Sequence, residues 1–576
     1  MKTSITLQIH LLRTAMIITA ITLFIPVFGQ TEKIPPVNKK IFQQGEFPTS
    51  AYVPSPRDSH AKSPAYRFEG TGFTVVQVNV DDNGFNILDD AANEPSIAFD
   101  PNDPNRIAIG WRQFDNINNS FRQAGYGFTY DAGETWIFPG VIDEGIFRSD
   151  PVLRSDRDGN FYYNSLTNNG GNYSCNVYKS EDGGEIWEMG TYAQGGDKQW
   201  MSIDMTEGIG SGNIYAFWNP SYSACPPYGF TRSTDDNVSY PECFSIPNDP
   251  IWGTTFVDPD GNLYVCGALW SGFMVSRSPD AKDPGLDVSW DITSDIFLDG
   301  EIIGFGGYQC PNPEGLLGQT QIAMDSSGGP GDGNLYLLCS VERNSNSDPC
   351  DIMFARSTDG GETWDWPVRV NDDPGNNAWQ WFATMSVAPD GRIDVIWLDT
   401  RDNPGDVNSA LYYSYSLDEG TTWSQNEKLS ESFDPHVGWP QQNKMGDYFD
   451  MYSDEDAAHL AWAATFNGEQ DVYYSVITPD YVGLNEDRQE TARLSVNYPN
   501  PFSDQTTIRY QVNAREHASL KVYSAAGKEV AILAEGIHAA GLYRKVFDGS
   551  SLGSGVYYYR LQTGDRTETG RMMLVR

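Results

Sequence analysis

The sequence predicts an all-β protein of 576 residues, in which a seven-bladed β-propeller is followed by a small β-sandwich. Three observations predict this fold class. One eight-residue phrase recurs along the chain, a strand–turn–strand unit recurs seven times, and the C-terminal residues change to longer alternating strands. Self-similarity at the period of one blade is typical of propellers, and alternation of apolar and polar residues is typical of half-buried strands.

The recurring phrase follows the pattern Ser-x-Asp-x-Gly-x-Thr-Trp. We expect its Asp to accept backbone N–H groups inside a tight turn, its Gly to adopt a positive φ and its Trp to pack between neighbouring blades. These residues are therefore interpreted as structural. The copies are 129–136, 180–187, 233–240, 357–364 and 416–423, with Asp131, Asp182, Asp235, Asp359 and Asp418 at the third position. Residues 278–290 look like a further copy that is split by an insertion.

Seven predicted hairpins set the number of blades. Each consists of a short strand, a turn that in most units is of the Asp-Gly or Gly-Asn type, and a second strand, and such turns between apolar runs are strong hairpin signals. Seven units predict seven blades within residues 66–482, and six blades are the alternative if one unit is miscounted. The units are 94–111, 150–166, 200–218, 253–267, 321–339, 382–399 and 447–462.

Charge and the N-terminus indicate an exported protein. With 38 Lys and Arg against 78 Asp and Glu, the formal net charge is −40, which argues against nucleic acid or an anionic membrane as partner. Residues 1–29 resemble a secretory signal peptide, because basic residues precede the apolar run TAMIITAITLFIPVF. Residues 30–65, rich in Pro, Lys and Ser, are predicted to form a loose leader. We expect the mature chain to be a monomer.

The seven cysteines are an odd number, so at least one is expected to be unpaired. An exported chain permits disulfides. Cys225 with Cys243, and Cys310 with either Cys339 or Cys350, are the plausible pairs.

No cofactor or metal centre is predicted. His is scarce, with six in the chain, and the Cys spacing is unlike that of zinc sites. Structural calcium is a possibility at Asp156, Asp158 and Asn160, which offer oxygens at alternate positions. A role in the hairpin turn explains these three residues more simply.

The order of strands in a blade predicts which residues share one end of the propeller. If the third strand runs down to the recurring phrase, the opposite, upper end collects residues just before first strands and just after second strands. Arg side chains there could bind a carboxylate in bidentate fashion, or could pair with neighbouring Asp or Glu to hold loops. Indole faces could stack on sugar rings. The candidate substrate-binding residues are Trp200, Trp252, Trp381, Gln199 and Asp399.

The phrase resembles the Asp box of sialidase-type propellers, and NEPSIAFDPNDPN, DKQW, RSTDGGETW and MGDYFDMYSD extend the resemblance over most of residues 90–475. The resemblance implies a secreted bacterial propeller that acts on or binds extracellular glycans or glycoproteins. The Arg-Ile-Pro signature of sialidases is missing, and the nearest text is Phe-Arg-Ser-Asp-Pro at 147–151. The site that the resemblance implies has Arg112, Arg343 and Arg401 as carboxylate clamp, Tyr448 as nucleophile, Glu94 as its base and Asp150 as proton donor.

The C-terminal residues 494–576, after a linker at 483–493, carry a second resemblance. YPNPF and SGVYYYRL, together with a basic end, closely resemble the C-terminal sorting domain of type IX secretion cargo in Bacteroidota. This implies a small Ig-like β-sandwich, contact with the type IX machinery, and release or anchoring at the outer surface. An ordinary Ig-like carbohydrate module is the alternative.

Three classes of function remain open at this point. The chain could be a glycoside hydrolase, a non-catalytic adhesin or scaffold that binds glycan or protein, or a polysaccharide lyase. Paired carboxylates about 5–10 Å apart at the upper end would favour the hydrolase. An aromatic-lined face without such a pair would favour binding, and a lyase would need a Tyr, His or Lys base beside an Arg.

Overall fold

The structure is a computed structural model that describes residues 50–304, 309–375, 377–479, 497, 500–512, 515–525, 527–538, 541–563 and 566–575. The predicted signal peptide, most of the leader and the linker at 483–493 lie outside the described residues. The chain divides into two compact units, Met1–Gly483 and Leu484–Arg576. Within the described part, no helix has the length and apolar character that a membrane crossing requires.

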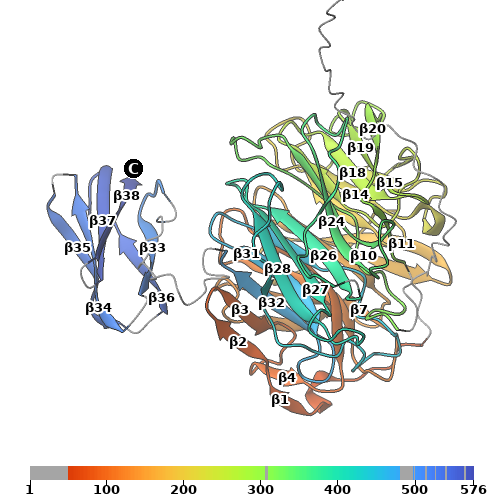
Figure 1. The fold of residues 1–576 in the computed structure, drawn as a ribbon, viewed down its shortest axis with the longest axis horizontal. Coiled ribbons are helices and arrows are strands. Elements are labelled where there is room, and N and C mark those ends of the chain that lie inside the picture. Colours follow the sequence, from red (N-terminus) through yellow and green to blue (C-terminus); the bar gives the residue numbers. More distant parts are fainter. Residues whose placement is uncertain are drawn as a thin grey trace, which may run out of the picture. The chain divides into compact units, whose positions relative to one another are not determined.

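Among the described residues of the larger unit, seven antiparallel sheets form the propeller, one for each predicted hairpin, and a separate two-stranded sheet pairs β1 (Lys62–Pro64) with β4 (Phe85–Ile87) (Figure 1). We number the propeller sheets as blades 1 to 7. Blade 1 contains β5 (Ala91–Phe99), β6 (Ile107–Phe114), β7 (Gln123–Thr129) and β8 (Ile137–Ile142); blade 2 contains β9 (Ser149–Ser155), β10 (Phe161–Asn169), β11 (Asn172–Ser180) and β12 (Thr191–Tyr192); blade 3 contains β13 (Trp200–Ile203), β14 (Ile214–Phe217), β15 (Phe230–Ser233) and β16 (Cys243–Phe244).

The remaining blades repeat this order with two variations. Blade 5 has two short strands, β21 and β22, on the same edge of β23, and blade 7 gains two strands from the N-terminus. Blade 4 contains β17 (Thr255–Val257), β18 (Leu263–Ala268), β19 (Phe273–Ser278) and β20 (Ile292–Ile296); blade 5 contains β21 (Gly300–Ile302), β22 (Gln321–Met324), β23 (Leu335–Arg343), β24 (Asp351–Ser357) and β25 (Val368–Arg369); blade 6 contains β26 (Gln380–Val387), β27 (Ile393–Asp399), β28 (Ala410–Ser416) and β29 (Glu427–Lys428); blade 7 contains β30 (Asp450–Ser453), β31 (Ala458–Ala464), β32 (Asp471–Ile477), β3 (Phe73–Gln77) and β2 (Arg67–Gly70).

The first strands of the blades close into a ring. They contact one another in the order β5, β9, β13, β17, β22, β26 and β30, and β30 contacts β5 again. Blade 7 joins the two ends of the ring, because β3 pairs with β32 from Phe73↔Ile477 to Gln77↔Tyr473. The all-β class and the seven-bladed propeller are therefore confirmed.

The recurring phrase forms the hydrogen-bonded turn that its sequence predicts. In the copy at 357–364, Asp359 accepts hydrogen bonds from the Ser357 hydroxyl (2.8 Å), the Thr363 N–H (2.9 Å) and the Thr363 hydroxyl (2.6 Å). The split copy at 278–290 forms the corresponding hydrogen bond: the Ser289 N–H donates to Asp280 over 2.8 Å despite the insertion.

The Trp of the phrase packs on the preceding blade, as predicted. The ring of Trp136 in blade 1 lies 5.3 Å from Tyr474 of blade 7, and the ring of Trp423 in blade 6 lies 5.1 Å from Phe354 of blade 5. Each such plug buries a large apolar surface between two neighbouring sheets.

Strand register separates the two ends of the propeller. Phe99 pairs with Ile107 and Ile107 with Thr129, which immediately precedes the first Asp box. Ala91 pairs with Phe114 at the opposite end of the same blade. The Asp boxes therefore lie at one end, called here the lower face, and the starts of the first strands lie at the other, the upper face.

The N-terminal described residues lie along blade 1. A 3₁₀ turn, η1 (Arg57–Ser59), precedes β1 (Lys62–Pro64), which pairs with β4 (Phe85–Ile87). The Arg57 guanidinium donates to the Phe138 carbonyl over 2.7 Å and lies 4.4 Å from the Phe138 ring centroid. Residues 50–64, part of the predicted leader, thus pack on the propeller.

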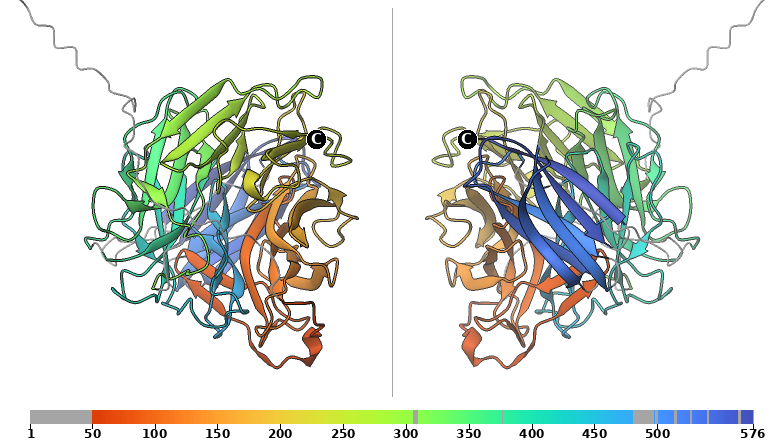
Figure 2. Two further views of the ribbon diagram at one scale, coloured as in Figure 1. Left: turned by 90° about the vertical axis from the view of Figure 1, so that its right-hand side faces the viewer. Right: turned by 90° about the vertical axis from the view of Figure 1, so that its left-hand side faces the viewer.

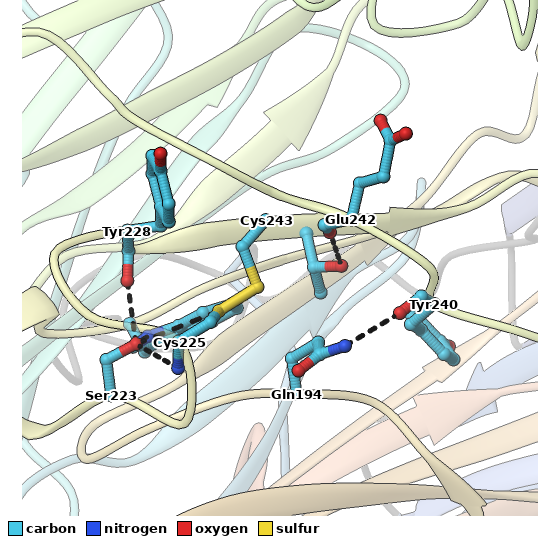
Figure 3. The surroundings of a disulfide bond; sticks show 9 residues. Gln194, Ser223, Cys225, Tyr228, Tyr240, Glu242 and Cys243 are labelled. Carbon is cyan, nitrogen blue, oxygen red and sulfur yellow. Dashed lines mark hydrogen bonds between the residues drawn. A yellow bond between two sulfur atoms is a disulfide. The ribbon is translucent and has the colours of Figure 1, made fainter.

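One disulfide joins Cys225 to Cys243, which confirms that predicted pair (Figure 3). It ties the loop after η2 (Pro220–Tyr222) to the edge strand β16. The prediction that Cys310 pairs with Cys339 or Cys350 is wrong, since all three are buried and none of them is part of a disulfide. Cys310 and Cys350 belong to the same apolar core cluster, and the Cys350 Sγ donates to the Gln380 carbonyl over 2.9 Å.

The smaller unit is a two-sheet β-sandwich, which appears in blue in Figure 2. Its core contains Phe502, Ile508, Leu520, Phe547 and Leu561. One sheet pairs β33 (Gln505–Val512) with β36 (Gly541–Asp548), and the other orders β35 (Glu529–His538), β34 (Glu516–Ser524), β37 (Gly555–Thr563) and β38 (Arg566–Leu574). This confirms the predicted small sandwich.

Candidate functional site: a charged cluster on the propeller axis

Every blade has one residue with positive φ where its first strand begins at the upper face. Non-glycine residues seldom adopt this conformation, and bulky ones least of all. Such backbone persists only where the surroundings hold it, and it is frequent at functional sites. The seven positions, with φ in parentheses, are Glu94 (57°), Asp150 (47°), Lys198 (56°), Trp252 (56°), Gly318 (139°), Phe382 (59°) and Gly446 (96°).

In blades 1, 2, 3 and 7 this ring carries or adjoins charged side chains, which form a buried group that we call the axial cluster. It contains four carboxylates and four cationic groups, and every member is at most 5% exposed. The buried phenol of Tyr448 belongs to it as well. The charged members are Glu94, Asp150, Asp197, Asp447, Arg112, Arg122, Lys198 and Lys444.

A salt bridge between blades that are not neighbours lies at the centre of the cluster. The Nζ of Lys198, at the start of blade 3, is 2.5 Å from Oδ2 of Asp447, at the start of blade 7. The Nζ of Lys444 contacts the same oxygen over 2.7 Å, while the Leu316 N–H donates to Asp447 Oδ1 over 2.7 Å. Because blades 3 and 7 are separated in the ring, the Lys198–Asp447 pair spans the propeller axis.

Tyr448 crosses the axis beside this pair. Its hydroxyl donates to the Pro151 carbonyl of blade 2 over 2.7 Å. Its ring meets Trp200 of blade 3 edge-on, with centroids 5.2 Å apart. Protein groups therefore fill the upper part of the axis.

The carboxylates of blades 1 and 2 are also engaged by the protein. Glu94 Oε2 lies 2.7 Å from Nε of Arg112, and the same Nε donates to Asn93 Oδ1 over 2.8 Å. Asp150 accepts hydrogen bonds of 2.9 Å from the Ser149 hydroxyl and from the Lys198 N–H. The Gln199 amide donates to the Asp150 carbonyl.

Burial governs the protonation of the cluster. Burial raises the pKa of Glu94 to about 8 although Arg112 opposes it, and raises the pKa of Asp197 to about 7 although Lys198 opposes it. Burial lowers the pKa of Lys444 to about 8. Burial also acts to raise the pKa of Asp447, but Lys198 and Lys444 outweigh it and hold that pKa well below its ordinary value.

A strap from blade 5 joins the start of blade 7 and covers the cluster. It consists of residues 309–319. Within it, the buried Asn312 amide donates to the Gly446 carbonyl over 2.8 Å and accepts from the Met445 N–H over 2.8 Å. The Asn443 amide donates to the Glu314 carboxylate over 2.9 Å. The strap is thus hydrogen-bonded to the segment that carries Asp447, and its Leu316 N–H contacts that carboxylate directly.

The structure brings some of the predicted site residues together and places others apart. Glu94, Arg112, Asp150 and Tyr448 lie in the axial cluster, with Gln199 and Trp200 beside it. Arg343, the last residue of β23, instead contacts Asp299 (2.7 Å) and Asp351 (2.9 Å), the first residue of β24, in blade 5. Arg401 contacts Asp399 (2.8 Å) and Asp372 (2.7 Å) at blade 6.

The three tryptophans predicted to stack on sugars have their indoles in the protein interior. Trp200 is 1% exposed, Trp252 2% and Trp381 0%. Trp381 donates through Nε1 to the Ser409 hydroxyl over 3.0 Å and packs on Phe382. In this structure their faces therefore contact protein.

Sequence reasoning missed the cationic half of the cluster and the exposed indoles. Lys198 lies inside DKQW and Lys444 directly precedes MGDYFDMYSD, two segments that carry the family resemblance, and that position is the available signal. Trp270, 69% exposed, lies in the turn between β18 and β19 at the upper face. Trp379 and Trp439 are half-buried in upper-face loops.

The carboxylate of Asp156 accepts hydrogen bonds from residues of its own turn. Asp156 accepts hydrogen bonds from the N–H groups of Asp158 (2.9 Å) and Asn160 (3.0 Å), and from the Asn160 amide (2.8 Å). The role in the hairpin turn accounts for these contacts.

Comparison with known proteins identifies the tail first. Residues 496–575 match the family model of the secretion system C-terminal sorting domain. The protein is therefore exported by the type IX secretion system, as a secreted or cell-surface propeller. No curated protein sequence matches the chain.

A comparison with solved structures finds matches of low sequence identity. A protein of unknown function from Dyadobacter fermentans is 13% identical, with 72% of this chain and 99% of that chain covered and a TM-score of 0.40. A sialidase from Trypanosoma rangeli is 9% identical, with 91% and 90% covered and a TM-score of 0.35. A GH93 α-L-arabinofuranosidase from Fusarium graminearum is 10% identical, with 73% and 99% covered and a TM-score of 0.27.

Proposed function

We propose that the protein is an extracellular, non-catalytic propeller that binds neutral glycans through its upper face. The observation that carries the proposal is the closed axial cluster. Lys198 reaches across the axis to Asp447, and Tyr448 is committed to the Pro151 carbonyl. A substrate at the axis would have to displace these contacts and the strap that covers them.

The three arginines predicted to clamp a carboxylate also support a propeller without catalytic activity. A carboxylate clamp needs guanidinium groups that converge and are available to the substrate. Arg343 contacts two carboxylates of the protein, Arg401 contacts three, and Arg112 contacts Glu94. Their charges are therefore balanced before any ligand arrives, which supports binding without sialidase-type chemistry.

Exposed indoles support a glycan as the ligand. Trp270 presents most of its ring to solvent, and Trp379 and Trp439 lie in other loops of the same face. Tryptophan combines a large flat apolar surface with a polar N–H, a combination that suits the faces of sugar rings. The net charge of −40 disfavours acidic polymers, so the proposed ligand is a neutral glycan.

The test is a glycan array on the full-length exported protein, followed by affinity measurements on the best neutral ligand. We expect Trp270→Ala to weaken binding at least tenfold. Trp366→Ala is the matched control, because Trp366 is 63% exposed but follows the Asp box at 357–364, away from the upper-face loops. Equal losses in both variants, or a preference for sialylated or uronic glycans, would refute the proposal.

A further inference from the structure

We infer that the glycan site of the upper face lies on blade 4, where a neutral pyranose stacks on the indole of Trp270 and its hydroxyl groups bind the side chains of Asn248 and Asp249. The inference rests on the proposed function, and it adds the position of the site and the basis of its selectivity. Trp270 lies in the turn between β18 and β19, and the two polar residues lie in the loop that leads from β16 to β17. Both segments belong to the upper face.

A tight turn presents the indole to solvent. The Leu269 N–H donates to the Gly272 carbonyl over 3.0 Å, so that only Trp270 and Ser271 lie between these two residues. Gly272 has a φ of 85°, which glycine adopts without steric cost. The Trp270 side chain is 69% exposed. An aromatic ring on a backbone that is already ordered gives up little conformational freedom when it binds a ligand.

Backbone contacts hold the neighbouring loop against this hairpin. The Ile251 N–H donates to the Ala268 carbonyl over 3.1 Å, and the Ala268 N–H donates to the Ile251 carbonyl over 2.7 Å. A Cβ on Gly267 would lie 2.8 Å from the Cβ of Pro250, so the loop and the strand are too close for any larger residue there. Because the two segments are antiparallel, the residues before Ile251 and those after Ala268 extend from this pair in the same direction.

This arrangement brings Asp249 and Trp270 to the same part of the upper face. Each lies two residues beyond the hydrogen-bonded pair, which is at most about 7 Å of chain, and antiparallel neighbours are about 5 Å apart. The loop and the tip of the hairpin therefore present their side chains next to one another, within reach of one sugar ring.

The loop holds its two polar residues in an unusual conformation. The φ angles of Asn248 and Asp249 are 63° and 50°. Asp249 also directly precedes Pro250, and proline restricts the backbone of the residue before it. The Asp249 N–H donates to the Ile246 carbonyl over 3.2 Å, which closes a turn. Such backbone persists only where its surroundings hold it, and it is frequent where proteins bind ligands.

The side chains of Asn248 and Asp249 are available to a ligand. Both residues are exposed, and within the part of the chain that the structure describes neither side chain forms a hydrogen bond or an ion pair. By contrast, the upper-face carboxylate of Asp399 already contacts Arg401 over 2.8 Å. A carboxylate accepts hydrogen bonds from hydroxyl groups, and an amide both donates and accepts them. The loop thus offers polar groups beside a flat apolar ring, the combination that a sugar site requires.

The charge of Asp249 gives the site its preference for neutral sugars. A carboxylate that contacts the bound ring repels the carboxylate of a uronic or sialic acid at close range, and juxtaposed like charges are a strong source of specificity. The net charge of −40 acts at longer range and is screened by salt. Discrimination against acidic sugars should therefore depend on Asp249.

Affinity measurements on variants of the full-length protein test the position of the site. The probes are methyl glucoside and methyl galactoside, and binding is followed by ligand-observed NMR. For the better probe, we expect Trp270→Ala to weaken binding at least tenfold. Asn248→Ala should weaken it about threefold and Asp249→Ala about tenfold, because hydrogen bonds to charged groups are the stronger ones. Asp260→Asn is the matched control, at an exposed position in the lower turn of the same blade, and should bind as the wild type does.

Asp249→Asn tests the selectivity. The change keeps the size of the side chain and removes its charge, and Asn tolerates a positive φ. We expect the affinity for the neutral probe to stay within about threefold of the wild type. The ratio of its affinity to that for the matching uronide, methyl glucuronide or methyl galacturonide, should fall at least tenfold. A purely structural role of Asp249 would not move this ratio, and the test remains if Asp249→Ala fails to fold.

The inference and the proposed function fail in different ways. If the wild type binds a neutral probe, while Asn248→Ala and Asp249→Ala bind it equally well and Asp249→Asn keeps the wild-type ratio, the inference is overturned and the proposed function stands. If the wild type binds no glycan on the array, the proposed function fails, and the inference fails with it.

Discussion

Substitution of Lys198 by Met tests the cross-axis salt bridge directly. The change keeps most of the length of the side chain and removes its charge. The cluster then has four carboxylates against three cationic groups, and Asp447 keeps only Lys444 as a lysine partner. Both members of the Lys198–Asp447 pair are nearly inaccessible, at 4% and 1% side-chain exposure. Removing one partner of a buried pair typically costs about 3–5 kcal/mol, because the other charge stays buried.

Lys198→Met should lower the free energy of unfolding by about 3 kcal/mol, the lower end of that range, because Lys444 still contacts Asp447 over 2.7 Å. Urea unfolding followed by tryptophan fluorescence gives the change in free energy from the shift of the propeller transition. Lys428→Met is the matched control. Lys428 lies 2.6 Å from Asp402, but both side chains are about 40% exposed, so its loss should cost less than about 1 kcal/mol. Equal costs for Lys198→Met and Lys428→Met would refute the cross-axis arrangement.

Three further predictions concern stability. Asp359→Ala removes the acceptor of three hydrogen bonds in one Asp box and should cost about 1–3 kcal/mol by thermal unfolding; an unchanged melting temperature would show that the turn holds without its Asp. Folding raises the pKa of Glu94 from 4.5 to about 8. Protonated Glu94 therefore stabilises the folded state fully below pH 4.5, and this stabilisation is lost as the pH rises through 8. Glu94→Gln should flatten that decline between pH 5 and 8, and an identical pH profile in the variant would contradict the assignment. Replacing Cys225 and Cys243 together by Ser opens a cross-link with a sequence separation of 18 and should cost about 3 kcal/mol in denaturant unfolding; a loss below about 1 kcal/mol would mean that the loop is ordered without the cross-link.

The fold could be predicted from the sequence because its signals are local. The Asp box satisfies its own hydrogen bonds within a few residues, so the phrase determines the turn wherever it occurs. Even the interrupted copy keeps the contact from Ser289 to Asp280. Strand order within a blade then assigned the two ends of the propeller correctly.

The candidate site depends on contacts that no local pattern contains. Lys198 and Asp447 meet because seven blades close a ring, and the sequence does not reveal which side chains cross its axis. The upper-face positions of Arg343 and Arg401 follow from strand order. Their partners, Asp351 at the start of β24 and Asp399 at the end of β27, cannot be recognised from a local pattern. Likewise, Trp200 and Trp270 are both tryptophans near the upper face, and only packing makes one buried and the other exposed.

The most direct test of the central claim measures binding and chemistry on the same sample. The full-length protein is incubated with the neutral glycans that it binds and with sialylated glycans, and released sugar and unsaturated products are measured. The account predicts saturable binding of a neutral glycan, with no sugar released and no unsaturated product formed from any ligand. Released sugar that disappears in Glu94→Gln would show that the axial cluster opens and acts as a catalytic site, and would contradict the account.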